Sequence, residues 1–114
     1  MVDSYKEKLK KLMDDYVNFV YDATSSFPRE ETYGSVSQWR RATLSIILNY
    51  IEGYARQRSL VQLNFYEMSY GSFRESKYLL YFASKRKFIP ESDFREGFRL
   101  VKKLVKCSGL KLTR

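Results

Sequence analysis

Histidine is absent from the sequence, and cysteine occurs once, at Cys107. Histidine is the commonest general base and metal ligand at neutral pH, so its absence argues against zinc sites and nucleophilic triads. A single cysteine cannot form an intrachain disulfide, and no second cysteine or histidine is present to activate or resolve it. We therefore interpret Cys107 as a small buried hydrophobe. We expect a protein without enzymatic activity, without a cofactor and without a bound metal.

Long apolar runs are also missing. The most apolar stretch, residues 42–51, is bounded by Arg41 and Glu52. It is too short to cross a bilayer, which takes about 18 to 20 apolar residues. The first residues do not show the basic and apolar regions of a signal peptide, and the cysteine usage indicates a reducing compartment. These absences predict a cytoplasmic protein with no membrane contact.

The sequence instead shows apolar residues that recur at steps of three and four, with only two prolines to interrupt them. These steps predict four helices, over residues 4–24, 36–58, 59–85 and from Pro90 to a stop at Gly109. Ser35 and Ser59 are the expected N-caps of the second and third helices. We predict one domain, residues 1–114, with the all-α fold of an antiparallel four-helix bundle.

The predicted helix over residues 59–85 carries two apolar stripes. One stripe passes through Tyr66 and Phe73, and the other passes through Met68 and Leu79. The rest of a small bundle can cover one of these stripes. Because a lone domain seldom leaves a second apolar strip in water, the pattern indicates a partner subunit.

Positive charge is concentrated at the end of the chain. The net charge is +8, and residues 85–114 hold 10 Lys or Arg against 3 Asp or Glu, which accounts for +7 of it. Clustered cations attract polyanions, most often phosphate backbones. Arg95, Arg99, Lys102 and Lys106 step by four, three and four residues, which places them on one helix face as a candidate phosphate track.

The basic residues near this track and near the end of the second helix complete the candidate set. The predicted nucleic-acid-binding residues are Arg56, Arg58, Lys85, Arg86, Lys87, Arg95, Arg99, Lys102, Lys103 and Lys106. An exposed tyrosine such as Tyr54 or Tyr81 could stack on bases, although burial is the commoner fate of a tyrosine. The alternative interpretation of the charge is an ordinary solvated face that keeps the protein soluble.

A polar stripe follows one side of the second predicted helix, and it too has two interpretations. Its arginines could bind phosphate, or the stripe could form a satisfied network that fixes helix register or a joint between subunits. We favour the structural interpretation for Arg41. The predicted network consists of Gln38, Arg41, Ser45, Asn49, Glu52 and, from the third helix, Glu75.

Several of these residues belong to a longer pattern. It comprises residues 27–34 (FPREETYG), residues 37–42 (SQWRRA), then Ser45, Ile46, Asn49, Glu52, Gly53, Tyr54, Ala55 and Arg56, and finally Gly71, Ser72 and Glu75. The pattern resembles a four-helix-bundle family that includes the 23S rRNA intervening-sequence proteins and the accessory variability determinant proteins of diversity-generating retroelements. Ser76 and Lys77 depart from it, since many members carry leucine or another apolar residue there.

This resemblance implies four helices that assemble as a ring or barrel of five subunits, with a positively charged surface and no known enzymatic activity. The retroelement members imply RNA and a reverse transcriptase as partners. Our first hypothesis is accordingly a non-catalytic, homo-oligomeric accessory protein that binds RNA, or RNA with cDNA, through its backbone phosphates. The alternative is a protein-only scaffold of the intervening-sequence type, whose charge aids solubility and steering alone.

Overall fold

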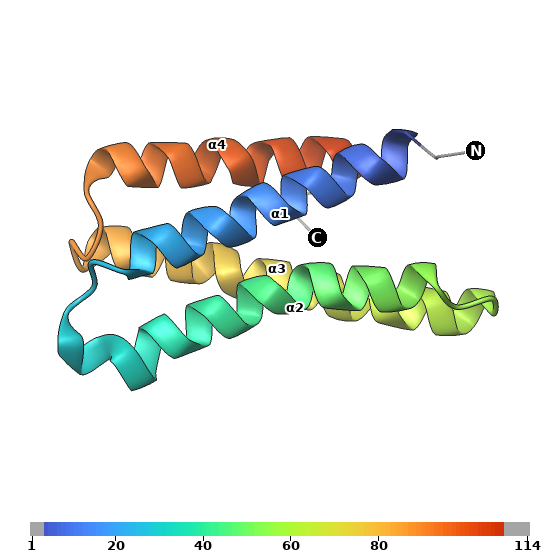
Figure 1. The fold of residues 1–114 in the computed structure, drawn as a ribbon, viewed down its shortest axis with the longest axis horizontal. Coiled ribbons are helices and arrows are strands. Elements are labelled where there is room, and N and C mark those ends of the chain that lie inside the picture. Colours follow the sequence, from blue (N-terminus) through green and yellow to red (C-terminus); the bar gives the residue numbers. More distant parts are fainter. Residues whose placement is uncertain (1–3, 109–114) are drawn as a thin grey trace.

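The computed structural model describes residues 4–108 as a bundle of four α-helices. These are α1 (Ser4–Thr24), α2 (Ser37–Tyr54), α3 (Ser59–Lys85) and α4 (Glu91–Ser108). The helices run alternately up and down, so that each is antiparallel to its neighbour (Figure 1). Within the described residues no segment forms a β-strand. The predicted all-α four-helix fold is confirmed.

The ends of α1 and α3 agree with the prediction, but the connection before α2 does not. The segment expected to be a loop is helical, with a 3₁₀ turn at Arg29–Glu31 and a π-helical turn at Thr32–Val36. Ser35 lies inside that turn, where its N–H and its hydroxyl donate to Glu31 Oε1, so the predicted Ser35 N-cap is wrong. The predicted stop at Gly109 lies outside the described residues.

The second expected N-cap is also wrong, and α2 is shorter than predicted. Ser59 is the first residue of α3, and the N-cap position belongs to Arg58, without a side-chain hydrogen bond. Helix α2 ends at Tyr54, four residues before the predicted end. Its last turn is closed by Ala55 N, which donates to Ile51 O, and by Arg56 N, which donates to Gly53 O in a tighter, 3₁₀-type bond.

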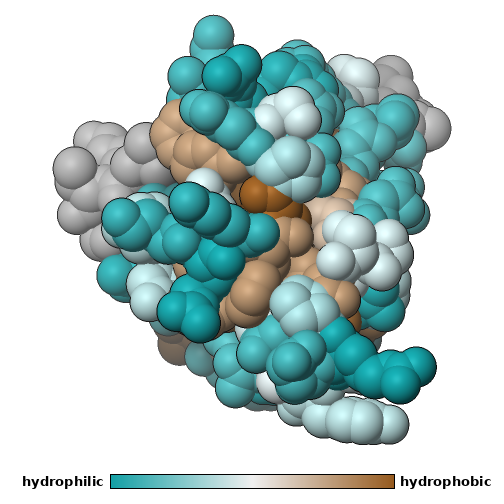
Figure 2. All heavy atoms as spheres, turned by 90° about the vertical axis from the view of Figure 1, so that its left-hand side faces the viewer, coloured by the Kyte–Doolittle hydropathy of each residue, from teal (hydrophilic) through white to brown (hydrophobic). Residues whose placement is uncertain are grey.

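All four helices contribute to one core, and α2 packs most extensively against α3. The largest fully buried side chains are Tyr16, Val20, Trp39, Thr43, Ser76, Leu80 and Val101. At the end that holds the α1–α2 and α3–α4 connections, the rings of Phe27 and Phe88 lie 5.1 Å apart. Figure 2 looks onto this end and shows an apolar centre surrounded by hydrophilic side chains. The packing of these aromatic rings thus closes the bundle at the end that holds the two connections.

A buried polar cluster, the Ser76 hub, ties three helices together. Trp39 Nε1 donates to Ser76 Oγ at 3.0 Å, Thr43 Oγ1 shares a 2.6 Å hydrogen bond with Ser76 Oγ, and Ser76 Oγ donates to Tyr16 Oη at 3.2 Å. Burial raises the pKa of Tyr16 to about 12, so its hydroxyl stays neutral at physiological pH. Buried polar groups are costly unless paired, and here each finds a partner from another helix or from its own backbone.

Helix α3 ends in a turn that fixes the path into α4. Phe88 N donates to Ala83 O at 2.9 Å and Lys87 N donates to Ser84 O at 3.0 Å, which is the hydrogen-bond pattern of a Schellman motif. Lys87 occupies its left-handed position with a φ of 60°. This turn places the cations of residues 85–87 beside the start of α4.

Candidate nucleic-acid interface

The four cations predicted as a phosphate track do share one exposed face of α4, but two of them are paired with carboxylates. Arg99 makes two hydrogen bonds to Glu96, at 2.8 and 2.7 Å. These bonds are the largest cause of a lowered pKa for the Glu96 carboxyl and a raised pKa for the Arg99 guanidinium. Arg95 lies 3.4 Å from Glu91 in a pair exposed on both sides. Arg99 is therefore the least available cation of the track.

The lysines further along α4 keep their charge in solvent. Lys102, Lys103 and Lys106 are exposed, and within residues 4–108 none of them forms an ion pair with a carboxylate. Lys102 Nζ lies 5.4 Å from the centre of the Phe98 ring, a cation–π contact that leaves its ammonium open to water. The C-terminal half of α4 is thus the part of the predicted track that can meet a phosphate.

The remaining predicted binding residues fall at opposite ends of the bundle. Lys85, Arg86 and Lys87 are exposed at the α3–α4 connection, close to the first turn of α4. Arg56 and Arg58 lie at the α2–α3 connection, at the other end of the long axis (Figure 1). Helix α3 joins these ends through 27 residues, or about 40 Å at 1.5 Å per residue. The predicted set therefore does not form a single patch.

Arg56 is further committed to local contacts. Its guanidinium lies 2.6 Å from Glu52 and 5.1 Å from the centre of the Phe65 ring. An exposed i,i+4 pair of this kind contributes little stability, but it cancels much of the positive potential at that end. The basic surface is therefore best defined by α4 and the α3–α4 connection.

A groove between α3 and α4 adds residues that the sequence analysis missed. It has a volume of about 480 Å³, and its lining contains cations and aromatic rings but no carboxylate. The lining residues are Arg74, Lys77, Tyr78, Leu80, Tyr81, Phe94, Phe98, Val101 and Lys102. Residues 74, 77, 78 and 81 follow the i, i+3, i+4, i+7 spacing of one helix face, which was the available signal. That face joins the lysines of α4 to a second row of cations on α3.

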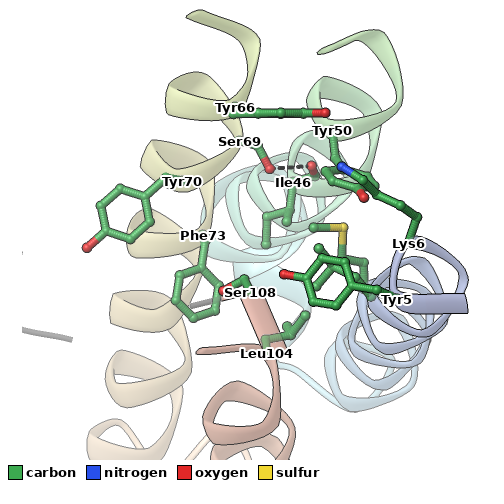
Figure 3. A pocket seen from close by; sticks show the side chains of 12 residues that line it. Tyr5, Lys6, Ile46, Tyr50, Tyr66, Ser69, Tyr70, Phe73, Leu104 and Ser108 are labelled. Atoms are coloured by element: carbon green, nitrogen blue, oxygen red, sulfur yellow. Dashed lines mark hydrogen bonds between the residues drawn. The ribbon is translucent and has the colours of Figure 1, made fainter. Parts of the chain in front are cut away.

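A second cavity lies at the end of the bundle near the α2–α3 connection, and Lys6 of the chain itself forms part of its lining. Its volume is about 230 Å³, and residues of all four helices line it. Figure 3 shows Lys6 reaching from α1 toward Tyr50 and Tyr66, and its Nζ lies 5.6 Å from the centre of each ring. The same Nζ lies 5.1 Å from the centre of the Tyr54 ring. Three rings around one ammonium form an aromatic cage, here occupied by an internal cation. Tyr54 therefore contacts Lys6 of its own chain. The stacking of bases on Tyr54 stays a prediction.

The predicted polar network lies along one side of the α2–α3 pair but is not connected within the chain. Asn49 Nδ2 donates to the backbone oxygen of Ser45 at 3.0 Å, and Glu52 pairs with Arg56. Among residues 4–108, no side-chain hydrogen bond or ion pair joins Gln38, Arg41 or Glu75 to the others. A network that includes all six residues stays a prediction.

Large apolar side chains beside this polar stripe are exposed. Leu44, Leu48 and Ile51 follow a three- and four-residue step on the outer face of α2, and Leu48 is 52 % exposed. On α3, Met68 of the second predicted apolar stripe is 42 % exposed, whereas Leu79 of the same stripe is buried. The α2–α3 pair thus presents an uncovered apolar strip with polar groups alongside.

Metal sites and membrane-spanning helices are the two other features that residues 4–108 could carry. No group of three or more Cys, Asp or Glu residues in this part of the chain is arranged to hold a metal ion. None of the described helices has the length and apolar character that a membrane crossing requires. Cys107 is a free thiol that is half-buried and packs against the core.

These observations define the class: a four-helix-bundle protein with a basic face along α4 and an aromatic groove beside it. The family model for the 23S rRNA-intervening sequence proteins matches residues 6–108, and the chain belongs to that family. A search of curated proteins finds no match. The resemblance to the 23S rRNA intervening-sequence proteins is therefore confirmed.

Proposed function

We propose that this chain is a non-catalytic nucleic-acid-binding protein whose ligand is RNA, or RNA with cDNA, held through its phosphates. The observation that carries the proposal is the exposure of Lys102, Lys103 and Lys106, none of which forms a close ion pair with a carboxylate among residues 4–108. Lys85, Arg86 and Lys87 extend this surface at the start of α4. Cations that stay hydrated release counterions from a phosphate backbone on contact, which drives sequence-independent binding.

A charge reversal placed on α4 tests this proposal. We expect Lys102→Glu with Lys106→Glu to weaken binding to a labelled RNA about tenfold or more in a gel-shift titration. The slope of log affinity against log salt should become shallower by about 1.4 to 1.8, because each lost phosphate contact removes about 0.7 to 0.9. The matched control is Lys8→Glu with Lys10→Glu, which makes the same change of net charge on exposed positions of α1.

The control shows whether RNA affinity depends on the position of the charges on α4 or only on the net charge of the protein. If the α1 pair weakens binding as much as the α4 pair, the contact is not on α4. If the unmodified protein binds no RNA near physiological salt, the nucleic-acid function is wrong and the protein-only scaffold is favoured. The reverse-transcriptase partner and the retroelement role stay predictions from the resemblance to the retroelement accessory proteins.

We also propose that the chain forms a homo-oligomer, with a pentamer as the expected state. The support is the uncovered apolar strip of Leu44, Leu48 and Ile51 next to Gln38 and Arg41, whose side chains lack partners within residues 4–108. A second copy of the chain would bury the apolar strip and would provide hydrogen-bond partners for Gln38 and Arg41. Light scattering coupled to size exclusion should give about 68 kDa for five copies of a 13.6 kDa chain. We expect Leu48→Glu to shift that mass downward, and a monomeric unmodified protein would contradict the proposal.

A further inference from the structure

We propose that the α3–α4 groove is a binding site for the unpaired nucleotides of single-stranded RNA, with bases stacked on Tyr78, Tyr81 and Phe98 and phosphates held by Arg74, Lys77 and Lys102. The inference rests on the proposed nucleic-acid function and deepens it. It adds a class of ligand, unpaired rather than duplex RNA, and a site for the bases.

The groove has an apolar floor and two mixed walls. Leu80 and Val101, which are almost fully buried, form part of its floor between the helices. The wall on α3 carries Tyr78 and Tyr81, and the wall on α4 carries Phe98. Helices α3 and α4 make the least extensive contact of the neighbouring pairs, which leaves room for a volume of about 480 Å³. That volume lies within the usual range of small-ligand sites, about 300 to 1,000 Å³.

The aromatic rings of the walls are partly exposed to solvent, and each also has a neighbour within the chain. Tyr78 lies against Phe82, Lys85 lies over Tyr81, and Phe98 lies against Phe94 and under Lys102. Tyr78 is 60 % exposed, Tyr81 is 51 % exposed and Phe98 is 42 % exposed. The Tyr78 and Tyr81 rings lie 6.2 Å apart on consecutive turns of α3. Aromatic rings held this way offer faces on which any base can stack, as in proteins that bind single strands without sequence preference.

The charge of the groove favours a polyanion over a protein partner. Arg74, Lys77 and Lys102 contribute positive charge, and the lining contains no carboxylate. Within residues 4–108 none of these three cations forms an ion pair. A second copy of a chain with a net charge of +8 would bring further cations toward this groove. Phosphates spaced along a nucleic-acid strand would instead neutralise the positive charge of the groove.

The combination of rings and cations selects unpaired nucleotides. A duplex presents phosphates and sugars on its surface while its bases remain stacked inside, so the rings of Tyr78, Tyr81 and Phe98 would gain no stacking partner. A single strand can place its bases in the groove and its phosphates on the flanking cations. The lysines of α4 can contact either form, whereas the groove distinguishes them.

The test compares a labelled 12-nucleotide oligoadenylate with a 12-base-pair RNA duplex by fluorescence anisotropy. The variant is Tyr78→Leu with Tyr81→Leu, which removes two ring faces and no charge. We expect single-strand affinity to fall about tenfold or more, with duplex affinity and the salt slope unchanged. The control is Tyr33→Leu, at a tyrosine that is 96 % exposed outside the groove. This control should leave single-strand affinity unchanged.

A second variant keeps the proposal testable if the tyrosine pair disturbs folding. Arg74→Gln with Lys77→Gln should weaken binding of the single strand and flatten its salt slope by about 1.4. Unchanged single-strand affinity in both variants, while the unmodified protein still binds RNA, would overturn the groove site and leave the nucleic-acid function standing. A shift of oligomeric mass in the variants without any loss of RNA affinity would also overturn it, because a second copy would then occupy the groove. Failure of the unmodified protein to bind either RNA would remove the proposed function itself.

Discussion

Replacing Ser76 with leucine should lower the free energy of unfolding by about 2 to 6 kcal/mol, although the family resemblance favours leucine at this position. The site is fully buried. Extra methyl groups in a packed core cost about 1 to 3 kcal/mol. The Trp39 Nε1 donor would also lose its acceptor, and a buried donor without a partner costs about 1 to 3 kcal/mol more. This total is a large part of the stability of a small domain, about 5 to 15 kcal/mol.

Urea unfolding followed by circular dichroism, at one fixed protein concentration, measures the effect. Ser76→Ala is the control, because it removes the hydroxyl without adding volume and should cost about 1 to 3 kcal/mol. The leucine variant should therefore be clearly less stable than the alanine variant. If leucine proved as stable as serine, the Ser76 hub would not determine how α1, α2 and α3 pack.

Gly97→Ala and Gly71→Ala should change stability in opposite directions, with a difference of about 1 to 3 kcal/mol between them. A Cβ at Gly97 would lie 2.7 Å from Phe19 and 2.8 Å from Leu80, because α4 approaches α1 and α3 closely there. Such overlap costs about 1 to 3 kcal/mol. A Cβ at Gly71 would meet nothing within 4 Å, so alanine should stabilise α3 by up to about 1 kcal/mol.

The same urea measurement checks the pair. Since both changes are glycine to alanine inside a helix, the difference between them isolates the packing at Gly97 from helix propensity. An equally stable Gly97→Ala variant would show that the Phe19 ring can move aside. A Gly71→Ala variant that loses oligomeric mass would place Gly71 in contact with a second copy.

The helices were predictable because apolar periodicity is a direct consequence of one-sided burial. Residues 4–24 and 59–85 were predicted to the residue or nearly so, since their apolar positions repeat without interruption. The start of α2 was not, because a serine before a helix is usually a cap. Here the N–H and hydroxyl of Ser35 donate instead to the Glu31 carboxylate, inside a π-helical turn. Which acceptor a serine meets depends on backbone geometry that the sequence does not state.

The candidate site was predictable only in part. The spacing of Arg95, Arg99, Lys102 and Lys106 gave the basic face of α4, but not the pairing of Arg99 with Glu96 three residues earlier. The groove was missed because its two walls come from different helices. The rotation of α3 against α4, which brings Tyr81 near Phe98, is a property of the packed bundle. Single-helix patterns carry no information about it.

The Ser76 hub also bears on which arrangement of helices the chain selects. A purely apolar seam between α2 and α3 would tolerate sliding by one turn, since one leucine can replace another against a flat neighbour. Here a slide of four residues would bring Leu80 to the place of Ser76, leaving the indole N–H of Trp39 facing a methyl group. Packings in which α3 is shifted against α2 are thereby disfavoured, so the Ser76 hub selects one register of these helices in the native bundle.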